Sequence, residues 1–109
     1  MRDLGRIVMS EGIRKVTAEF PGFHHIIQDA LEKFKENDWG IVSEDDAEVN
    51  FMALEEKEMV LGAYPSPIGE KIWLITDFYS RNDYRKVYGE PESSEELLPV
   101  TTILFPAEH

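Results

Sequence analysis

The sequence predicts a single α+β domain over residues 1–109, in which two to three helices pack on a small antiparallel meander of three to four strands. Three observations predict it. An apolar stripe with helical spacing runs through residues 23–34, and strand-forming segments joined by short connections follow it. The length of 109 residues, 42% of them hydrophobic, suits one modest core and leaves no room for a second domain.

The chain opens with "LGRIVMS", residues 4–10, which predicts a short strand or extended arm. Ser10 is suited to cap a short helix that runs to about Glu19, and "FPG" ends it, because the residue before a proline avoids the helical region. The apolar face of this helix would consist of Ile13, Val16 and Phe20.

The clearest element is an amphipathic helix that begins near Phe23. Its apolar residues recur at intervals of three and four over three turns, which places them on one face directed to the core. They are Phe23, Ile26, Ile27, Ala30, Leu31 and Phe34.

The segment "NDWGIVSEDDAEVN", residues 37–50, predicts the end of one helix and the start of another. Its turn residues and Gly40 end the first, and the Ser43 hydroxyl can accept a hydrogen bond from the amide of Asp46. Glu44 and Asp45 then lie at the positive end of the helix dipole. We expect the buried stripe of this second helix to be Ala47, Phe51 and Leu54.

Asn50 lies on the same stripe, where an amide side chain requires a hydrogen-bond partner. The backbone of the preceding D-W-G turn is the expected partner. Trp39 of that turn is expected to pack between the helices and the sheet.

Three strands are predicted in the second half, at residues 59–64, 71–78 and 100–105. The loop "PSPIGE" joins the first two, Trp73 alternates with apolar neighbours in the second, and Pro106 stops the third. Residues 80–99 form an insertion-like excursion, of which residues 84–88 are expected to extend the hairpin and residues 89–96 to form an acidic tip.

The charge is strongly acidic and uneven. The chain has 11 Lys and Arg against 22 Asp and Glu, a net charge of −11 and a pI near 4.6. Residues 36–58 carry nine acids against Lys57 alone, a net charge of −8. Such a field repels phosphate backbones and anionic membranes and favours a protein partner with a basic surface, although acidic surfaces also serve solubility alone.

The sequence lacks the residues that several classes of function require. The chain has no cysteine, which excludes disulfides, thiolate nucleophiles and thiolate metal sites and is consistent with the cytoplasm. It has no apolar run of membrane-spanning length, no nucleophile elbow and no phosphate-binding glycine loop. The carboxylates of "SEDDAE" miss the register of a calcium loop, so we expect neither a metal nor another cofactor.

One enzymatic alternative remains, that of a small ribonuclease or toxin using the sheet face. Such enzymes combine acid–base residues with cationic and aromatic side chains. The candidates here are Asp77, Tyr79, Arg81, Tyr84, Arg85 and Lys86. Tyr79, Tyr84 and Tyr88 also have the composition of a protein contact surface, or else pack on the excursion itself.

Motifs across residues 34–109 resemble a family of small bacterial proteins called plasmid-related proteins, sometimes labelled type I restriction enzyme subunits. The family pattern is a D-W-G turn and helix, a W-I-I-T-E strand and a T-T-x-L-x-P-x-E end. The matching residues here are Asp38, Trp39 and Gly40; Asp46, Asn50, Ala53 and Leu54; Trp73, Ile75, Thr76 and Asp77; and Thr101, Thr102, Leu104, Pro106 and Glu108.

The resemblance implies a mobile-element context, in plasmids and phage-like regions, and transfers no catalytic residue because the family has no established activity. This chain departs from the pattern by about eighteen residues inserted after Arg81 and by ending in His109, where tyrosine is commoner.

Together these observations predict a non-enzymatic acidic protein-binding module, in one version an anti-defence protein that mimics nucleic acid, and a homo-oligomer is a further alternative. Its contact surface is predicted to comprise Glu44, Asp45, Glu48, Tyr79, Arg81, Tyr84 and Tyr88.

Overall fold

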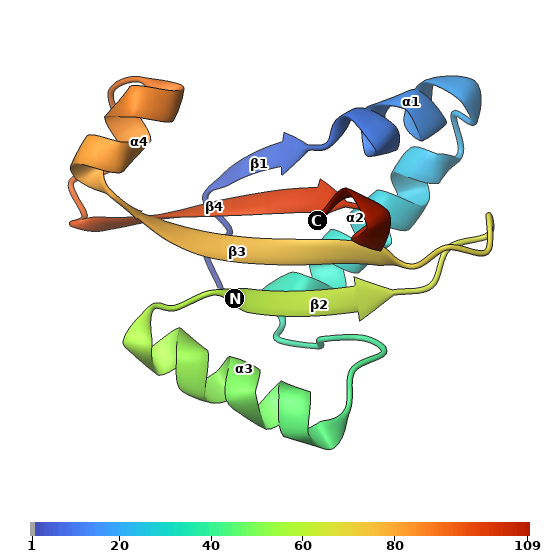
Figure 1. The fold of residues 1–109 in the computed structure, drawn as a ribbon, viewed down its shortest axis with the longest axis horizontal. Coiled ribbons are helices and arrows are strands. Elements are labelled where there is room, and N and C mark those ends of the chain that lie inside the picture. Colours follow the sequence, from blue (N-terminus) through green and yellow to red (C-terminus); the bar gives the residue numbers. More distant parts are fainter. Residues whose placement is uncertain (1) are drawn as a thin grey trace.

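The computed structural model describes residues 2–109 and shows an α+β fold, as the sequence predicts (Figure 1). Its four strands form one sheet, and four α-helices and a short 3₁₀ helix accompany them. The elements are β1 (Arg6–Met9), α1 (Glu11–Glu19), α2 (Phe23–Lys35), α3 (Glu44–Glu56), β2 (Val60–Tyr64), β3 (Ile72–Ser80), α4 (Arg81–Tyr88), β4 (Leu97–Leu104) and the 3₁₀ helix η1 (Pro106–Glu108).

The sheet has the strand order β1-β4-β3-β2. The pairs β2–β3 and β3–β4 are antiparallel, but β1 pairs with β4 in parallel, with Ile7 opposite Thr101. The prediction of a purely antiparallel meander is therefore wrong, and the sheet is mixed. Parallel neighbours in a sheet need a long connection between them, and β1 and β4 are separated in sequence by β2, β3 and the four α-helices.

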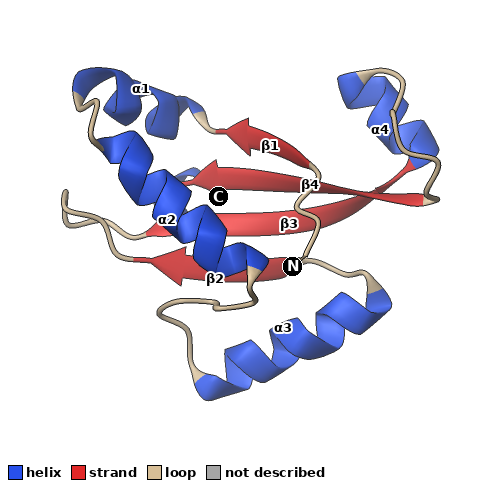
Figure 2. Ribbon diagram, turned by 180° about the vertical axis from the view of Figure 1, so that it is seen from behind, coloured by secondary structure: helices blue, strands red, loops and turns tan. Residues whose placement is uncertain are grey.

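Helices α1 and α2 cover one face of the sheet, and Figure 2 shows α2 lying across the strands. The predicted stripe of α2 is confirmed, since Phe23, Ile27, Ala30 and Phe34 are buried. They pack with Ile72, Leu74 and Ile103 of the sheet in one hydrophobic core. Burial of each of the Phe, Ile and Leu side chains in this core contributes roughly 1.5–3 kcal/mol to the free energy of folding.

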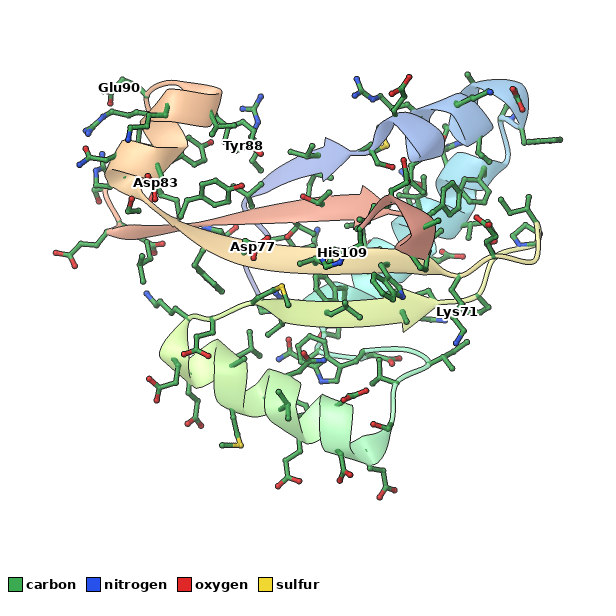
Figure 3. All side chains as sticks on the ribbon, in the orientation of Figure 1. Lys71, Asp77, Asp83, Tyr88, Glu90 and His109 are labelled. Carbon is green, nitrogen blue, oxygen red and sulfur yellow. The ribbon has the colours of Figure 1, made fainter. Side chains whose placement is uncertain are left out.

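The opposite face of the sheet carries a second row of buried apolar residues, among them Ile75, Val100 and Leu104. Side chains alternate between the faces of a strand, which places these residues away from the helical core. Trp73 lies on this face half-buried, and the ring of His109 packs edge-on against it with 5.6 Å between centroids. Asp77 and His109 project from the same side of the sheet in Figure 3.

The excursion between β3 and β4 forms a helix rather than the predicted extension of the hairpin. The Ser80 hydroxyl caps α4 by accepting from the amide of Asp83 at 3.1 Å, and Arg85 and Lys86 lie in its last turn. Gly89 ends it with a φ of 86°. These are standard start and stop signals, which outweigh the strand preference of the tyrosines.

Hydrogen bonds join the two ends of the chain to the fold. The Glu108 carboxylate accepts from the Ser10 hydroxyl at 2.6 Å and from the Gly12 amide at 2.9 Å, at the N-terminus of α1. The hydrogen bond from Ser10 is the main reason that the pKa of Glu108 lies below its usual value. Arg2 donates to the Phe34 carbonyl at 2.9 Å, near the C-terminal end of α2.

Among the described helices, none is both long enough and apolar enough to cross a membrane.

Candidate protein-interaction surface

Helix α3 carries the acidic residues that the sequence assigns to a contact surface, and its start is as predicted. Ser43 accepts from the amide of Asp46 at 3.0 Å, and Glu44, Asp45 and Asp46 occupy the first turn. The helix ends at Lys57, which adopts the left-handed conformation with a φ of 53°.

Asn50 attaches α3 to the sheet. Its side-chain Nδ2 donates to the Leu61 carbonyl at 2.8 Å, and its Oδ1 accepts from the Leu61 amide at 3.1 Å. The predicted need for a partner is confirmed, but the partner is strand β2 and not the D-W-G turn. One carboxamide therefore takes the place of a neighbouring strand at this edge of the sheet.

The D-W-G turn binds the same edge two residues further along. The Ala63 amide donates to the Trp39 carbonyl at 2.9 Å, and the Ile41 amide donates to the Ala63 carbonyl at 2.7 Å. Gly40 stands between them with a φ of 75°, where an added Cβ would lie 2.1 Å from the Ala63 oxygen. Asp38 shapes the turn by accepting from the Gly40 amide at 3.1 Å. The turn and Asn50 together close the β2 edge.

Trp39 is buried between helices and sheet, as predicted, at 4% exposure. Its ring meets Phe34 and Phe51 edge-on, with centroids 5.7 and 5.5 Å apart. Phe51 is nevertheless 50% exposed, so the prediction that it lies on the buried stripe is wrong. Asn50 and Ala53 are the buried residues of α3, because the helix meets the sheet edge through short side chains.

The solvent face of α3 combines carboxylates with large apolar side chains. Val49 and Met52 are 61% and 64% exposed. Residues three and four apart on a helix are neighbours, so four acids surround this apolar pair. We name this set the α3 outer face; it consists of Asp45, Glu48, Val49, Met52, Glu55 and Glu56, all exposed.

The carboxylates of the α3 outer face have no cationic partner among residues 2–109, where the one salt bridge joins Arg85 to Glu90. Acids in the first turn of a helix favour its dipole, but Glu55 and Glu56 lie in the last turn, which holds no basic residue. At that end, negative charge opposes the dipole by a few tenths of a kcal/mol per residue. These two acids therefore do not serve the stability of the helix.

The predicted tyrosines gather on α4 and β3. The ring of Tyr88 lies 5.9 Å from that of Tyr79 and 5.2 Å from that of Tyr84, and the Arg6 guanidinium lies 4.8 Å from the Tyr88 centroid. Burial, and then the neighbouring Tyr88, raise the pKa of Tyr79. The side chains pack on one another, and their role in contacting a partner stays a prediction.

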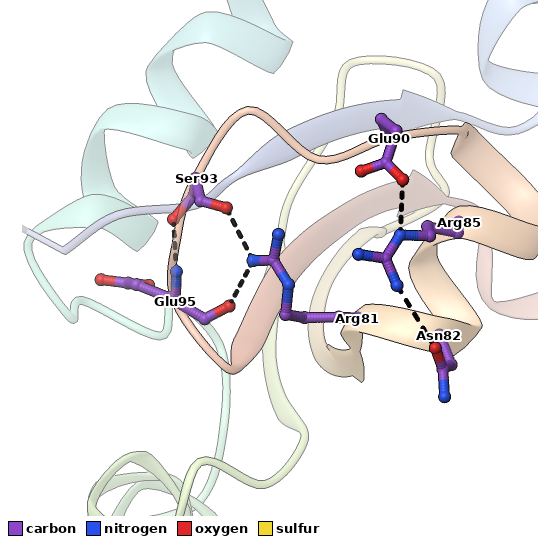
Figure 4. A network of polar contacts seen from close by, with 6 residues as sticks. All are labelled: Arg81, Asn82, Arg85, Glu90, Ser93 and Glu95. Carbon is purple, nitrogen blue, oxygen red and sulfur yellow. Dashed lines mark hydrogen bonds and ion pairs between the residues drawn. The ribbon is translucent and has the colours of Figure 1, made fainter.

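Arg81 and Arg85 hold the loop that follows α4 (Figure 4). Arg81 donates to the backbone carbonyls of Ser93 and Glu95 at 2.7 and 2.9 Å. Arg85 pairs with Glu90 at 2.7 Å. Both guanidinium groups therefore have structural partners.

The remaining motif residues contribute to the architecture. Thr101 is fully buried, and its hydroxyl donates to the Leu4 carbonyl at 2.8 Å and lies 2.7 Å from that of Thr76. Thr102 is half-buried opposite Ile75, and Pro106 begins η1.

The sheet face brings together only part of the residues that a ribonuclease would need. Asp77 and Tyr79 lie on it, half-buried. His109 packs on Trp73, which is four residues and about 13 Å along β3 from Asp77. Within residues 2–109, no three His, Asp or Glu side chains form a group suited to a metal ion.

The sequence indicated the charge of this surface but not its apolar component. Five of the ten exposed large hydrophobic side chains lie in or beside α3, namely Ile41, Val49, Phe51, Met52 and Met59. The available signal was that the apolar residues of α3 do not share one face, so some of them had to point to solvent.

Comparison with known proteins found no matching family model, no matching curated protein and no matching solved structure.

Proposed function

We propose that this chain is a non-enzymatic protein-binding module whose α3 outer face binds a basic surface of a partner protein. The observation that carries the proposal is the exposed pair Val49 and Met52 within a ring of unpaired carboxylates. An apolar centre with a charged rim is the usual composition of a protein interface. Surface acids that serve solubility alone require no such centre.

Charge and shape support a partner that itself binds nucleic acid. Helix α3 holds six carboxylates along 13 residues and no basic residue. A rigid row of negative charge resembles a phosphate backbone to a basic surface and speeds association with it. The motif resemblance to plasmid-related proteins supports a mobile-element context, in which an anti-defence protein would occupy the nucleic-acid site of a host enzyme.

The ribonuclease alternative has less support. Arg81 and Arg85 are engaged with the loop after α4, and His109 packs on Trp73, four residues along β3 from Asp77. The net charge of −11 also disfavours a ribonuclease, because it repels the phosphate backbone of RNA.

The proposal is tested by affinity capture from a nuclease-treated bacterial lysate at low and high salt, with quantitative mass spectrometry. The test variant is Glu48→Lys with Glu55→Lys, on the α3 outer face. The matched control is Glu19→Lys with Glu32→Lys, which makes the same charge change at exposed positions of α1 and α2.

We expect the wild type and the control to retain the same partner at low salt and the α3 variant to lose it by about tenfold or more. Added duplex DNA should release a partner that is held through its nucleic-acid site. Retention of every captured protein by the α3 variant, or capture of none, would contradict the proposal.

A further inference from the structure

The two edge strands of the sheet differ in their hydrogen bonding: other described segments bind the outer side of β2, whereas the outer side of β1 is free to pair. At the β2 edge, Asn50 and the D-W-G turn bind the outward backbone groups of Leu61 and Ala63. At the opposite edge, no helix or strand lies alongside β1 in Figure 1 or Figure 2.

The register shows which backbone groups of β1 are free. The Ser10 amide donates to the Ile103 carbonyl at 2.9 Å, so Val8 and Arg6, two and four residues before it, also direct their backbone groups to β4. Ile7 and Met9 therefore direct theirs outward. Among the described strands β1 pairs with β4 alone, and the side chains of Ile7 and Met9 are 43% and 37% exposed. This edge can pair with another extended chain.

A pocket of about 370 Å³ lies beside the start of β1, against α4 and the loop that follows it. Four acidic residues line it, Asp3, Glu90, Glu92 and Glu95, of which Glu90 is already paired with Arg85, and Arg6 is the one cationic residue of the lining. Tyr84 and Tyr88 also line it. Arg6 already lies over the Tyr88 ring, which leaves Tyr84 and the remaining carboxylates for an incoming ammonium or guanidinium group, a combination that offers both ion pairing and cation–π contact.

We propose that the free edge of β1 binds an extended segment of a partner protein by strand addition, with a Lys or Arg side chain of that segment in the acidic pocket. Backbone pairing with Ile7 and Met9 supplies affinity, and the pocket supplies selectivity for a basic residue. The site lies at the opposite edge of the sheet from α3 and rests on separate observations, so it does not depend on the function proposed above.

The charge favours a foreign segment over a second copy of this chain. Pairing two β1 edges would bring together two molecules of net charge −11 and two pockets of the same sign. A basic segment meets the opposite potential. The occupant is therefore a basic extended peptide.

The test is selection of a displayed library of random linear peptides on the intact chain, followed by affinity measurement with the enriched peptides. We expect enrichment of β-branched and apolar residues next to a Lys or Arg at a fixed position. In amide NMR spectra, these peptides should shift the resonances of Ile7 and Met9 more than those of α3.

Two variants locate the binding. Ile7→Pro removes an outward N–H that pairs with nothing in the fold, so the domain should keep its Tm within a few degrees while peptide affinity falls at least tenfold. Glu92→Lys with Glu95→Lys should abolish the preference for a basic residue. The α3 variant Glu48→Lys with Glu55→Lys should bind the peptides as the wild type does.

Three outcomes would overturn the proposal. One is enrichment no greater than on an unrelated acidic domain, and another is equal affinity for the wild type and a folded Ile7→Pro variant. The third is a concentration-dependent dimer in sedimentation that Ile7→Pro abolishes, because a second copy would then occupy the edge. Loss of capture through α3 leaves these outcomes unchanged, so the two proposals fail separately.

Discussion

At the scale of single residues, Asn50 shows how one side chain can complete a sheet. One N–H and the oxygen of its carboxamide have the geometry of a peptide group, and both bind the backbone of Leu61. An apolar residue at this position would leave the Leu61 amide and carbonyl without partners at a part-buried site. The free-energy penalty for leaving these two backbone groups unpaired is larger than the net stabilisation that the two hydrogen bonds contribute.

Replacement of Asn50 by leucine should lower the free energy of unfolding by about 2–4 kcal/mol, since two backbone groups lose their partner. Asn50→Asp keeps an acceptor for the Leu61 amide but places a buried carboxylate oxygen against the Leu61 carbonyl, so it too should be destabilising at neutral pH. Urea denaturation of both variants measures the effect. An Asn50→Leu protein with the stability of the wild type would show that water replaces the carboxamide.

At the scale of elements, the local sequence pattern predicted those features that depend only on residues close to one another in the chain. The period of α2, the cap at Ser43 and the loop before β3 are each defined within a few residues, and the structure has all three. Local pattern did not predict helix α4, because its apolar side consists of half-buried tyrosines, Tyr84 and Tyr88, and not of buried aliphatic residues. Its start and stop signals, from Ser80 to Gly89, were readable in the sequence.

Pairing between distant segments could not be read from local pattern. The parallel register of β1 joins Ile7 to Thr101 across the length of the chain, and the partner of Asn50 lies eleven residues away in another element. Neither partner leaves a periodic signal, because the choice depends on how the whole sheet closes. The exposure of Phe51 has the same cause, since a helix at a sheet edge buries less than one on a face.

Amide hydrogen exchange should separate the two edges of the sheet. The amides of Leu61 and Ala63 should exchange slowly because both are bonded, whereas those of Ile7 and Met9 should exchange at rates near those of an unstructured chain. In Asn50→Leu, exchange should accelerate at Leu61 more than at Ala63, which the D-W-G turn still holds. Equal protection at both edges would refute the assignment of β1 as open.

At the scale of the whole molecule, the excess of negative charge acts on stability as well as on binding. With one salt bridge among residues 2–109 and a net charge of −11, most carboxylates experience repulsion that no cation offsets. A count of charged residues in the sequence is enough to predict this imbalance and its concentration in residues 36–58. Which acids share a face with exposed apolar groups required the structure.

Sodium chloride should therefore raise the Tm of the protein by several degrees between about 0.01 and 0.5 M, as the Debye length falls below the spacing of the charges. The gain should be smaller in Glu48→Lys with Glu55→Lys, because that variant begins with less repulsion. Differential scanning calorimetry checks both. A Tm that does not change with salt in the wild type would mean that the carboxylates are too far apart to interact.

The attachment of α3 through Asn50 has a consequence for how this protein can diversify. The carboxamide recognises only main-chain atoms, so it demands nothing of the side chain at Leu61, and the solvent side of the helix contributes nothing to the core. Selection can thus rewrite the α3 outer face one residue at a time while the scaffold folds as before. Substitutions on this helix can therefore change which partner is bound while the fold stays the same.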